Sequence, residues 1–181
     1  ANYLSNGGNQ NLIAVDPRNS AIIYVGASDG IWQSTDWGVS LQHLSWPVQK
    51  VTEVIPDPQD PSAIYVCTTL GFYQTLDLGK TWSKLQLPSS AYPYAAAVSP
   101  SNNAVILVAL SQGAGRFQGG VLRSTDRGKT FRFANAGLST ATYNLGEDQL
   151  SIAFSPAAIG TNLIVALATS GGIYASSDDG D

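Results

Sequence analysis

Short apolar runs alternate along the chain with turns rich in glycine, proline, aspartate and serine, and this cycle occurs four times. Runs of this length, rich in Val, Ile, Leu and Tyr and bounded by turn residues, predict β-strands rather than helices. Each cycle has a strand leading into an Asp-Pro or Ser-Pro turn, a more uniformly apolar strand, a glycine-containing loop and a third strand. The expected first strands are 12–15, 51–55, 94–98 and 150–154, the second 21–26, 63–67, 105–110 and 163–168, and the third 31–34, 72–75, 121–124 and 173–176.

Each cycle ends in the same turn, Ser/Thr-x-Asp-x-Gly-x-x-aromatic, which we call the Asp turn. It connects the third strand to a fourth, expected at 81–87 and 130–134 in the second and third cycles. The four aspartates are 41, 49 and 52 residues apart, and a period of about 40–50 residues with several short strands is typical of propeller blades. The sequence therefore predicts an all-β β-propeller of four-stranded antiparallel blades, with three complete blades and most of a fourth.

The composition of the Asp turn predicts a structural role. Its glycine supplies a residue with positive φ, and its aspartate and hydroxyl side chains can bond turn amides that have no partner in the sheet. The aromatic residue is expected to pack the start of the fourth strand against the blade. The first copy departs from the pattern, with Leu41 in the aromatic position and Trp37 where a small residue is usual. The residues assigned this role are Ser34, Asp36, Gly38, Thr75, Asp77, Gly79, Trp82, Ser124, Asp126, Gly128, Phe131, Ser176, Asp178 and Gly180.

The Asp turn resembles the Asp-box, or bacterial neuraminidase repeat, of sialidases, sortilin-type receptors, photosystem assembly factors and xyloglucan-cleaving endoglucanases. The first blade, with Val-Asp-Pro at 15–17, Ile-Tyr-Val-Gly at 23–26 and Ser-Thr-Asp at 34–36, is most similar to sortilin-like and xyloglucanase-like exported propellers. The resemblance implies that the Asp turns lie away from the catalytic face. It also implies an extracellular or periplasmic protein.

A length of 181 residues fits one domain. The expected blades are 9–47, 48–89, 90–139 and 148–181, and 1–8 is an outer-strand remnant, because Tyr3-Leu4-Ser5 is similar to Phe133-Ala134-Asn135. An open ring would leave unpaired strand edges, which soluble proteins avoid. Either the chain is a piece of a six- to eight-bladed ring, or residues 2–5 supply the missing strand of the last blade and close a four-bladed ring.

Composition and charge exclude several classes of function. The net charge is −4 and the nine Lys and Arg are scattered, which argues against nucleic-acid binding. No apolar stretch is long enough for a membrane helix. The single cysteine, Cys67, excludes an internal disulfide and is expected to be a buried thiol. The chain contains no Met, and a removed signal peptide would leave an end such as Ala1, which favours export. No cofactor or metal ion is expected.

Candidate binding residues lie at the blade end opposite the Asp turns, where loops on a rigid scaffold commonly bind ligands. Aromatic and polar side chains there can stack on sugar rings, or they can simply seal the blades against water. The ligand-binding candidates are Tyr92, Tyr94, Arg116, Phe117 and Tyr143. Glycoside hydrolysis would need two carboxylates about 5–5.5 or 6.5–9.5 Å apart, and the acids available to an enzyme are Asp29, Glu53, Glu147 and Asp148.

These observations favour a non-catalytic, exported binding or assembly module whose partner is a carbohydrate or a protein. The first alternative is a glycoside hydrolase propeller of the xyloglucanase or endoglucanase type. The second alternative is a structural subunit that self-associates through open blade edges. A sialidase is not expected, because it needs an arginine triad, and two of the five arginines, Arg18 and Arg127, fall at the Asp-turn end.

Overall fold

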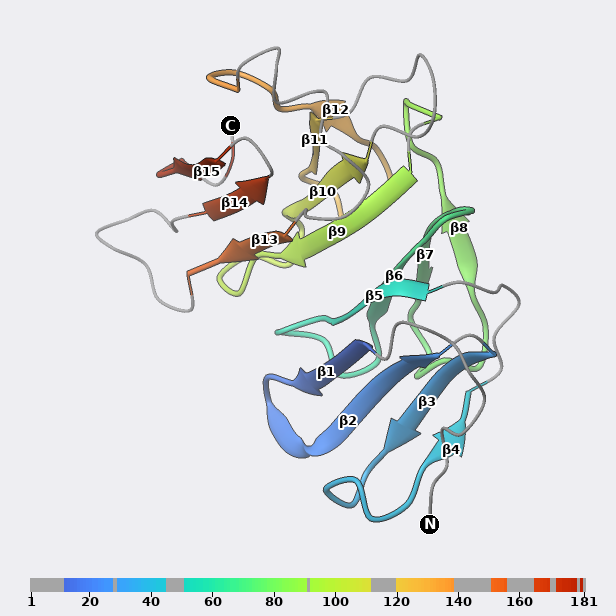
Figure 1. Cartoon of the computed structure of the whole chain (residues 1–181). Coiled ribbons are helices and arrows are strands. Elements are labelled where there is room, and N and C mark those ends of the chain that lie inside the picture. Colours follow the sequence, from blue (N-terminus) through green and yellow to red (C-terminus); the bar gives the residue numbers. More distant parts are fainter. Residues whose placement is uncertain are drawn as a thin grey trace. The chain divides into compact units, whose positions relative to one another are not determined.

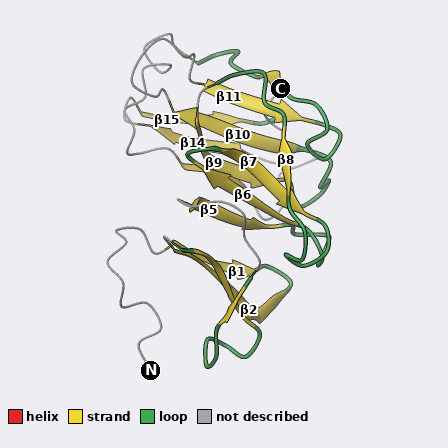
Figure 2. Ribbon diagram, turned by 90° about the vertical axis from the view of Figure 1, so that its right-hand side faces the viewer, coloured by secondary structure: helices red, strands yellow, loops and turns green. Residues whose placement is uncertain are grey.

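The computed structural model describes residues 12–27, 29–44, 51–90, 92–111, 120–138, 151–155, 165–169, 172–178 and 180. Across these residues the protein consists of strands, turns and loops, without a helix (Figure 2). The chain divides into two compact units, Ala1–Lys84 and Leu85–Asp181, each of which is described by itself. The fold class is therefore all-β, as the sequence predicts.

The first unit contains two antiparallel sheets, which we call the first and second blades (Figure 1). Strand order follows the sequence in each sheet. The first blade is β1 (Leu12–Asp16), β2 (Asn19–Ala27), β3 (Gly30–Ser34) and β4 (Gln42–His43), and the second is β5 (Val51–Pro56), β6 (Ile64–Thr68), β7 (Gly71–Thr75) and β8 (Ser83–Leu85), which ends one residue beyond the unit. Their shared core joins Tyr24 and Ile31 of the first blade to Val54, Ile64 and Val66 of the second.

The second unit contains the third and fourth blades, again with strand order following the sequence. The third blade is β9 (Tyr92–Val98), β10 (Ile106–Ser111), β11 (Gly120–Ser124) and β12 (Arg132–Phe133), and the fourth is β13 (Ser151–Phe154), β14 (Val165–Thr169) and β15 (Gly172–Ser176). Leu107 and Val121 of the third blade form a core with Ile152, Val165 and Leu167 of the fourth. Three four-stranded blades and three strands of a fourth are thus present among the described residues, as predicted.

The uniformly apolar second strands are central strands of their sheets. Strands β6 and β10 are buried along their whole length, which confirms the prediction from their composition. Strand β14 instead alternates, with Val165 and Leu167 buried in the core and Ala166 exposed. Its far face therefore has no cover among the described residues.

The fourth strands are shorter than expected. β8 has three residues and β12 has two, whereas the sequence predicted 81–87 and 130–134. The physical reason lies in the Asp turn, whose carboxylate accepts the amides of Thr81 and Thr130. These amides are therefore not available to the ladder of the sheet, and strand pairing begins two residues later.

Each blade is a meander, so its first and third turns lie at one end, the turn end, and its second connection at the other, the loop end. The first turns form as predicted. Asp16 Oδ1 accepts the Arg18 amide at 2.8 Å, and Asp57 Oδ1 accepts the amides of Gln59 and Asp60 at 2.8 and 2.9 Å. Both aspartates are buried at these turns.

A leucine at the end of an outer strand packs against the Asp-turn glycine of the next blade. A Cβ atom added to Gly79 would lie 2.9 Å from Leu44 Cδ1, and one added to Gly128 would lie 2.9 Å from Leu85 Cδ1. Real Cβ atoms do not approach carbon this closely, so a side chain at either position would force the leucine to shift. We call this contact the leucine seat.

We predict that Gly79→Ala destabilises the protein more than Gly137→Ala, by about 1–3 kcal/mol in urea unfolding. The two glycines have similar φ angles, +82° and +78°, so both substitutions introduce the same backbone strain. Gly137 has no heavy atom of a described residue within 4 Å of an added Cβ, and only Gly79 meets a leucine. Leu44→Ala should remove most of the difference, and equal losses for the two glycines would contradict the leucine seat.

Candidate functional site

The Asp turn has the same hydrogen bonds in the first three blades. In the second blade, Thr75 Oγ1 donates to Asp77 Oδ1 at 2.7 Å and accepts the Gly79 amide at 2.9 Å. Asp77 in turn accepts the Thr81 amide at 2.9 Å on Oδ1 and the Thr81 hydroxyl at 2.6 Å on Oδ2. Equivalent bonds join Ser34, Asp36, Gly38 and Ser40, and Ser124, Asp126, Gly128 and Thr130.

The fourth copy keeps the same beginning. Ser176 Oγ donates to Asp178 and accepts the Gly180 amide at 3.0 Å. The Ser/Thr, Asp and Gly positions thus make the same first hydrogen bonds in all four turns. Trp82 is half-buried and packs against the core of the first unit, whereas Leu41 stands at this position in the first copy.

Two consecutive residues of each complete Asp turn have positive φ. The glycines have φ of +85°, +82° and +82°, and the residues before them, Trp37, Leu78 and Arg127, have φ of 64°, 61° and 61°. This is the φ combination that a type I′ turn requires. The amides of these three residues donate to the carbonyls of Ala21, Ser62 and Ala104 at 3.0–3.1 Å. Each Asp turn is thus bonded to β2 or to the turn that leads into β6 or β10, as well as joining the third and fourth strands.

The hydrogen bonds hold the Asp-turn carboxylates in their ionised form. The pKa values of Asp36, Asp77 and Asp126 are lowered to about 2. The largest cause is the hydroxyl four residues later, from Ser40, Thr81 or Thr130, followed by the amide of the same residue and the hydroxyl two residues earlier. A general acid at neutral pH needs a raised pKa, so these carboxylates are suited to a structural role rather than to acid catalysis.

We predict that the stability of the protein falls between about pH 4 and pH 2. The folded-state pKa of about 2 lies below the ordinary aspartate pKa of about 3.9, so the unfolded state takes up protons first as pH falls. The stabilisation is fully present above about pH 4 and is lost as pH approaches the folded-state value. Urea unfolding from pH 6 to pH 2 measures this, with a triple Asn variant at 36, 77 and 126 as the control. An equally steep fall in the variant would exclude these groups.

Side chains gather at the loop end of the first blade, on the short connection between β2 and β3 and at the end of β4. Trp32 Nε1 donates to Asp29 Oδ1 at 3.1 Å. His43 Nε2 lies 3.1 Å from the Asp29 carbonyl oxygen and must donate to it, because a carbonyl only accepts. The Trp32 and His43 rings meet edge to face with centroids 4.9 Å apart. We call Asp29, Trp32 and His43 the loop-end cluster.

The loop-end cluster is open to solvent. Asp29 and His43 are exposed, and Trp32 is half-buried. The hydrogen bond from Trp32 and the contact with His43 hold the indole ring in place without burying it completely. The cluster therefore presents a carboxylate, an imidazole and an aromatic ring together at the surface.

A related contact closes the loop end of the second blade. Lys84 Nζ donates to the Leu70 carbonyl at 2.6 Å and lies 5.9 Å from the centre of the Tyr73 ring. Lys84 and Leu70 are 14 residues apart, as are His43 and Asp29. In both blades of this unit, a side chain of the outer strand thus caps the connection between the second and third strands.

The other predicted site residues are placed differently. Tyr92, at the loop end of β9, is 44% exposed, whereas Tyr94 packs against the core of the second unit. Glu53 is half-buried and opposite Cys67 in the sheet. Cys67 is a buried thiol, as predicted, and its pKa is raised by burial and, to a smaller extent, by the charge of Glu53. The candidates Arg116, Phe117, Tyr143, Glu147 and Asp148 lie outside the described residues.

The acids predicted from the sequence include Asp29, but neither Trp32 nor His43 is among the predicted site residues. His43 follows the first Asp turn on an outer strand, where an ordinary surface side chain is expected, and Trp32 lies within a short strand. Their partnership depends on the pairing of Trp32 with His43 across β3 and β4. The sequence does contain one indication of this pairing. Residues at equal distances before and after the Asp turn lie opposite each other in a hairpin, and Trp32 and His43 are such a pair.

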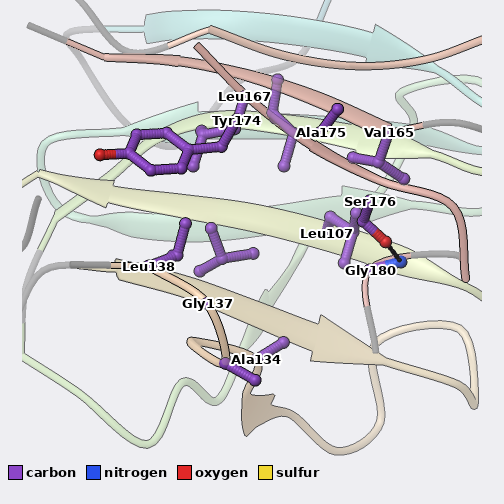
Figure 3. Close-up of a pocket in the computed structure, with 13 residues that line it drawn as sticks. Leu107, Ala134, Gly137, Leu138, Val165, Leu167, Tyr174, Ala175, Ser176 and Gly180 are labelled. Atoms are coloured by element: carbon purple, nitrogen blue, oxygen red, sulfur yellow. Dashed lines mark hydrogen bonds between the residues drawn. The ribbon is translucent and has the colours of Figure 1, made fainter. Parts of the chain in front are cut away.

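An apolar cavity of about 130 Å³ lies between the third and fourth blades (Figure 3). Its lining includes Leu107, Val121, Ile152 and Leu167 of the core, together with Ala134 and Gly180. The Ser176 hydroxyl beside it already accepts the Gly180 amide. Among the described residues that line the cavity there is no carboxylate or imidazole, so these residues supply no group suited to acid–base catalysis.

The cavity has a simple origin in the repeat. The Ala134 amide donates to Val121 O at 2.9 Å, as the Leu44 amide donates to Ile31 O at 2.8 Å, so Ala134 occupies the leucine position of the seat. Gly180 instead faces Leu107, whose Cδ1 lies 2.9 Å from an added Cβ. The smaller side chain at 134 therefore leaves space that Leu44 and Leu85 fill in the other blades.

We predict that Ala134→Leu stabilises the protein by about 1–2 kcal/mol, because the added methyl and methylene groups become buried in the cavity. Urea unfolding of the purified variant measures the gain. Ala136→Leu is the matched control, since Ala136 also borders the cavity but is exposed, and we expect it to change stability little. A loss of stability in Ala134→Leu would show that the space is not available to a leucine.

Among the described residues, no group of three His, Cys, Asp or Glu side chains is placed to hold a metal ion. Over the same residues, no helix has the length and apolar character needed to cross a membrane.

No protein-family model matches the chain, and no curated protein sequence does. Solved structures match nearly all of it. An ancestral GH74 enzyme matches 97% of the chain with a TM-score of 0.75 and 18% identity, and the GH74 xyloglucanase from Xanthomonas campestris matches 98% with 0.72 and 19%. YCF48 bound to D1 peptide matches 92% with 0.53 and 14%.

The chain spans 24%, 30% and 52% of these three structures, respectively. At such identities the matches show the fold alone. They confirm the β-propeller architecture that the period of the Asp turn predicts.

Proposed function

We propose that the chain is an Asp-box propeller domain, or part of one, that acts outside the cytoplasm as a non-catalytic carbohydrate-binding module. The loop-end cluster is the observation that carries this proposal. The apolar face of an indole suits the C–H face of a sugar ring, and the neighbouring carboxylate and imidazole can bond hydroxyl groups. The fixed orientation of Trp32, held by Asp29 and His43, lowers the entropy lost when a ligand is bound.

The two ends of the blade differ in how many polar groups are available to a ligand, and this difference supports the same function. At the turn end, the carboxylates have their oxygens engaged by hydroxyl and amide donors. At the loop end, Asp29 and His43 are exposed and adjacent to an aromatic ring. A ligand therefore has more groups to bind at the loop end. The fold shared with a GH74 xyloglucanase makes a β-glucan the first polysaccharide to test.

The alternative function is glycoside hydrolysis. It requires a pair of carboxylates at a defined separation. Asp29 is the exposed acid of the loop-end cluster, whereas the candidates Glu147 and Asp148 lie outside the described residues. The fold match to a structure with a bound peptide keeps a protein ligand as the other class of binding partner.

We predict that Trp32→Ala weakens binding of xyloglucan oligosaccharides roughly tenfold, which corresponds to about 1.4 kcal/mol. Isothermal titration calorimetry measures the affinity. Trp37→Ala is the matched control, because Trp37 is 69% exposed on the same blade but lies at its turn end, and it should bind as the wild type does.

Unchanged affinity in Trp32→Ala would exclude the loop-end cluster as the binding site. The same samples are assayed for release of reducing ends. Turnover by the wild type that Asp29→Asn abolishes would contradict a non-catalytic role and support the hydrolase.

A further inference from the structure

Two side chains that fill the interface between the first and second blades have smaller counterparts between the third and fourth. Tyr24 and Leu107 occupy equivalent positions, because each lies opposite the residue that precedes the Ser of its Asp turn. Leu44 and Ala134 are also equivalent, since the amide of each donates to the third strand of its blade. Tyr24 and Leu44 belong to the core of the first unit, whereas Leu107 and Ala134 line the apolar cavity of about 130 Å³. The cavity is therefore specified by two positions of the third blade.

The cavity extends from the core of the second unit to its surface (Figure 3). Leu107 and Ile152, at its inner end, are 0% and 6% exposed. Ala136, Gly137 and Ala175 also line the cavity and are exposed. An apolar group can thus reach the buried leucine and isoleucine from solvent without displacing a core side chain.

Hydrogen bonds hold the rim of the cavity in place. The Ala134 amide donates to Val121 O at 2.9 Å, and the Val121 amide donates to Asn135 Oδ1 at 2.9 Å. The Leu138 amide donates to Asn135 O at 3.1 Å, which closes a turn after β12. A segment bonded in this way resists moving inward to fill the space. The cavity is consequently formed before a ligand arrives, which lowers the entropy lost on binding.

The volume and the rim of the cavity indicate what kind of group fits. Pockets for whole small molecules have volumes of about 300–1,000 Å³, so a volume of about 130 Å³ accommodates a single side chain. In the other two interfaces the corresponding space holds a leucine, which contacts Gly79 or Gly128. The exposed residues of the rim are two alanines and a glycine, and side chains this small allow a main chain to pass close to the opening.

We propose that this cavity is a binding pocket for one leucine side chain of an extended peptide segment in a protein partner. The cavity interrupts the core between the third and fourth blades, and a leucine from the partner would complete that core. The side chain would be buried against Leu107, Ile152 and Leu167, as Leu44 is buried in the core of the first unit. Removal of its apolar surface from water supplies the affinity. The pocket lies in the second unit, so this inference is independent of the ligand bound at the loop end of the first blade.

The test is an NMR titration of the purified protein with the blocked tripeptide acetyl-Gly-Leu-Gly-amide, read at the methyl groups of Leu107, Ile152 and Leu167. Acetyl-Gly-Ala-Gly-amide is the matched control probe, because it has the same main chain without the branched group. We expect saturable shifts with the leucine peptide, and an affinity about tenfold or more above that of the alanine peptide. Equal affinities for the two peptides would overturn the proposal.

Three variants of the protein test whether the peptide enters the cavity. Ala134→Leu fills the space from within and should abolish binding, and urea unfolding of the same sample shows that the variant is folded. Ala134→Gly leaves the space open and should bind at least as tightly as the wild type. Ala166→Leu is the matched control, since Ala166 is exposed on the face of β14 opposite Val165 and Leu167, and its binding should be unchanged. Undiminished binding by folded Ala134→Leu would exclude the cavity as the binding pocket.

Xenon distinguishes an accessible pocket from a closed cavity, because it enters dry apolar cavities. Xenon shifts at the same methyl groups, together with binding of the leucine peptide, support the proposal. Xenon shifts without binding of either peptide would show that a side chain carried by a main chain cannot enter, and the proposal would be wrong. It would also be wrong if neither xenon nor the peptides bind. Tighter binding of acetyl-Gly-Phe-Gly-amide than of the leucine peptide would assign the pocket to an aromatic group and contradict the leucine assignment.

Discussion

Two consecutive residues with positive φ at each Asp turn are the constraint on which the blades depend. They reverse the chain tightly enough for the third and fourth strands to pair, but they leave amides without partners in the sheet. The Ser or Thr hydroxyl and the aspartate satisfy these amides, and the amide of Trp37, Leu78 or Arg127 donates to a carbonyl in the second strand or just before it. One turn therefore joins the third and fourth strands and also bonds to the start of the hairpin's neighbour, which explains why the same residues recur while the strands around them vary.

The same glycine links the local turn to the packing of neighbouring blades. Its missing side chain permits the backbone conformation and also leaves the space that Leu44 or Leu85 fills. Backbone geometry and interblade packing consequently place the same requirement on one residue. Where alanine replaces the leucine, at Ala134, the turn still forms but a cavity remains between the blades. The turn conformation therefore depends on the turn residues themselves, whereas the residue at the leucine position determines how completely the space between the two blades is filled.

In the proposed function, stability and recognition belong to opposite ends of the first blade. At the turn end, hydrogen bonds lower the aspartate pKa values and engage the carboxylate oxygens. At the loop end, the short connection of the first blade leaves Asp29, Trp32 and His43 accessible. Loops can vary there without disturbing the turns, because the two ends share only the strands between them. The position of the Asp turns in sequence therefore indicates where a ligand is not expected.

The sequence by itself determined the elements and their order, because apolar runs, Asp-Pro turns and the Asp turn are local patterns with local physical causes. Glycine at 38, 79 and 128 predicted positive φ correctly. Only the tertiary structure decided which side chains meet, since the contact of Leu44 with Gly79 depends on a neighbouring blade and the pairing of Trp32 with His43 depends on strand register. Register and blade packing join residues that are far apart in sequence, and a pattern read along one chain does not contain those distances.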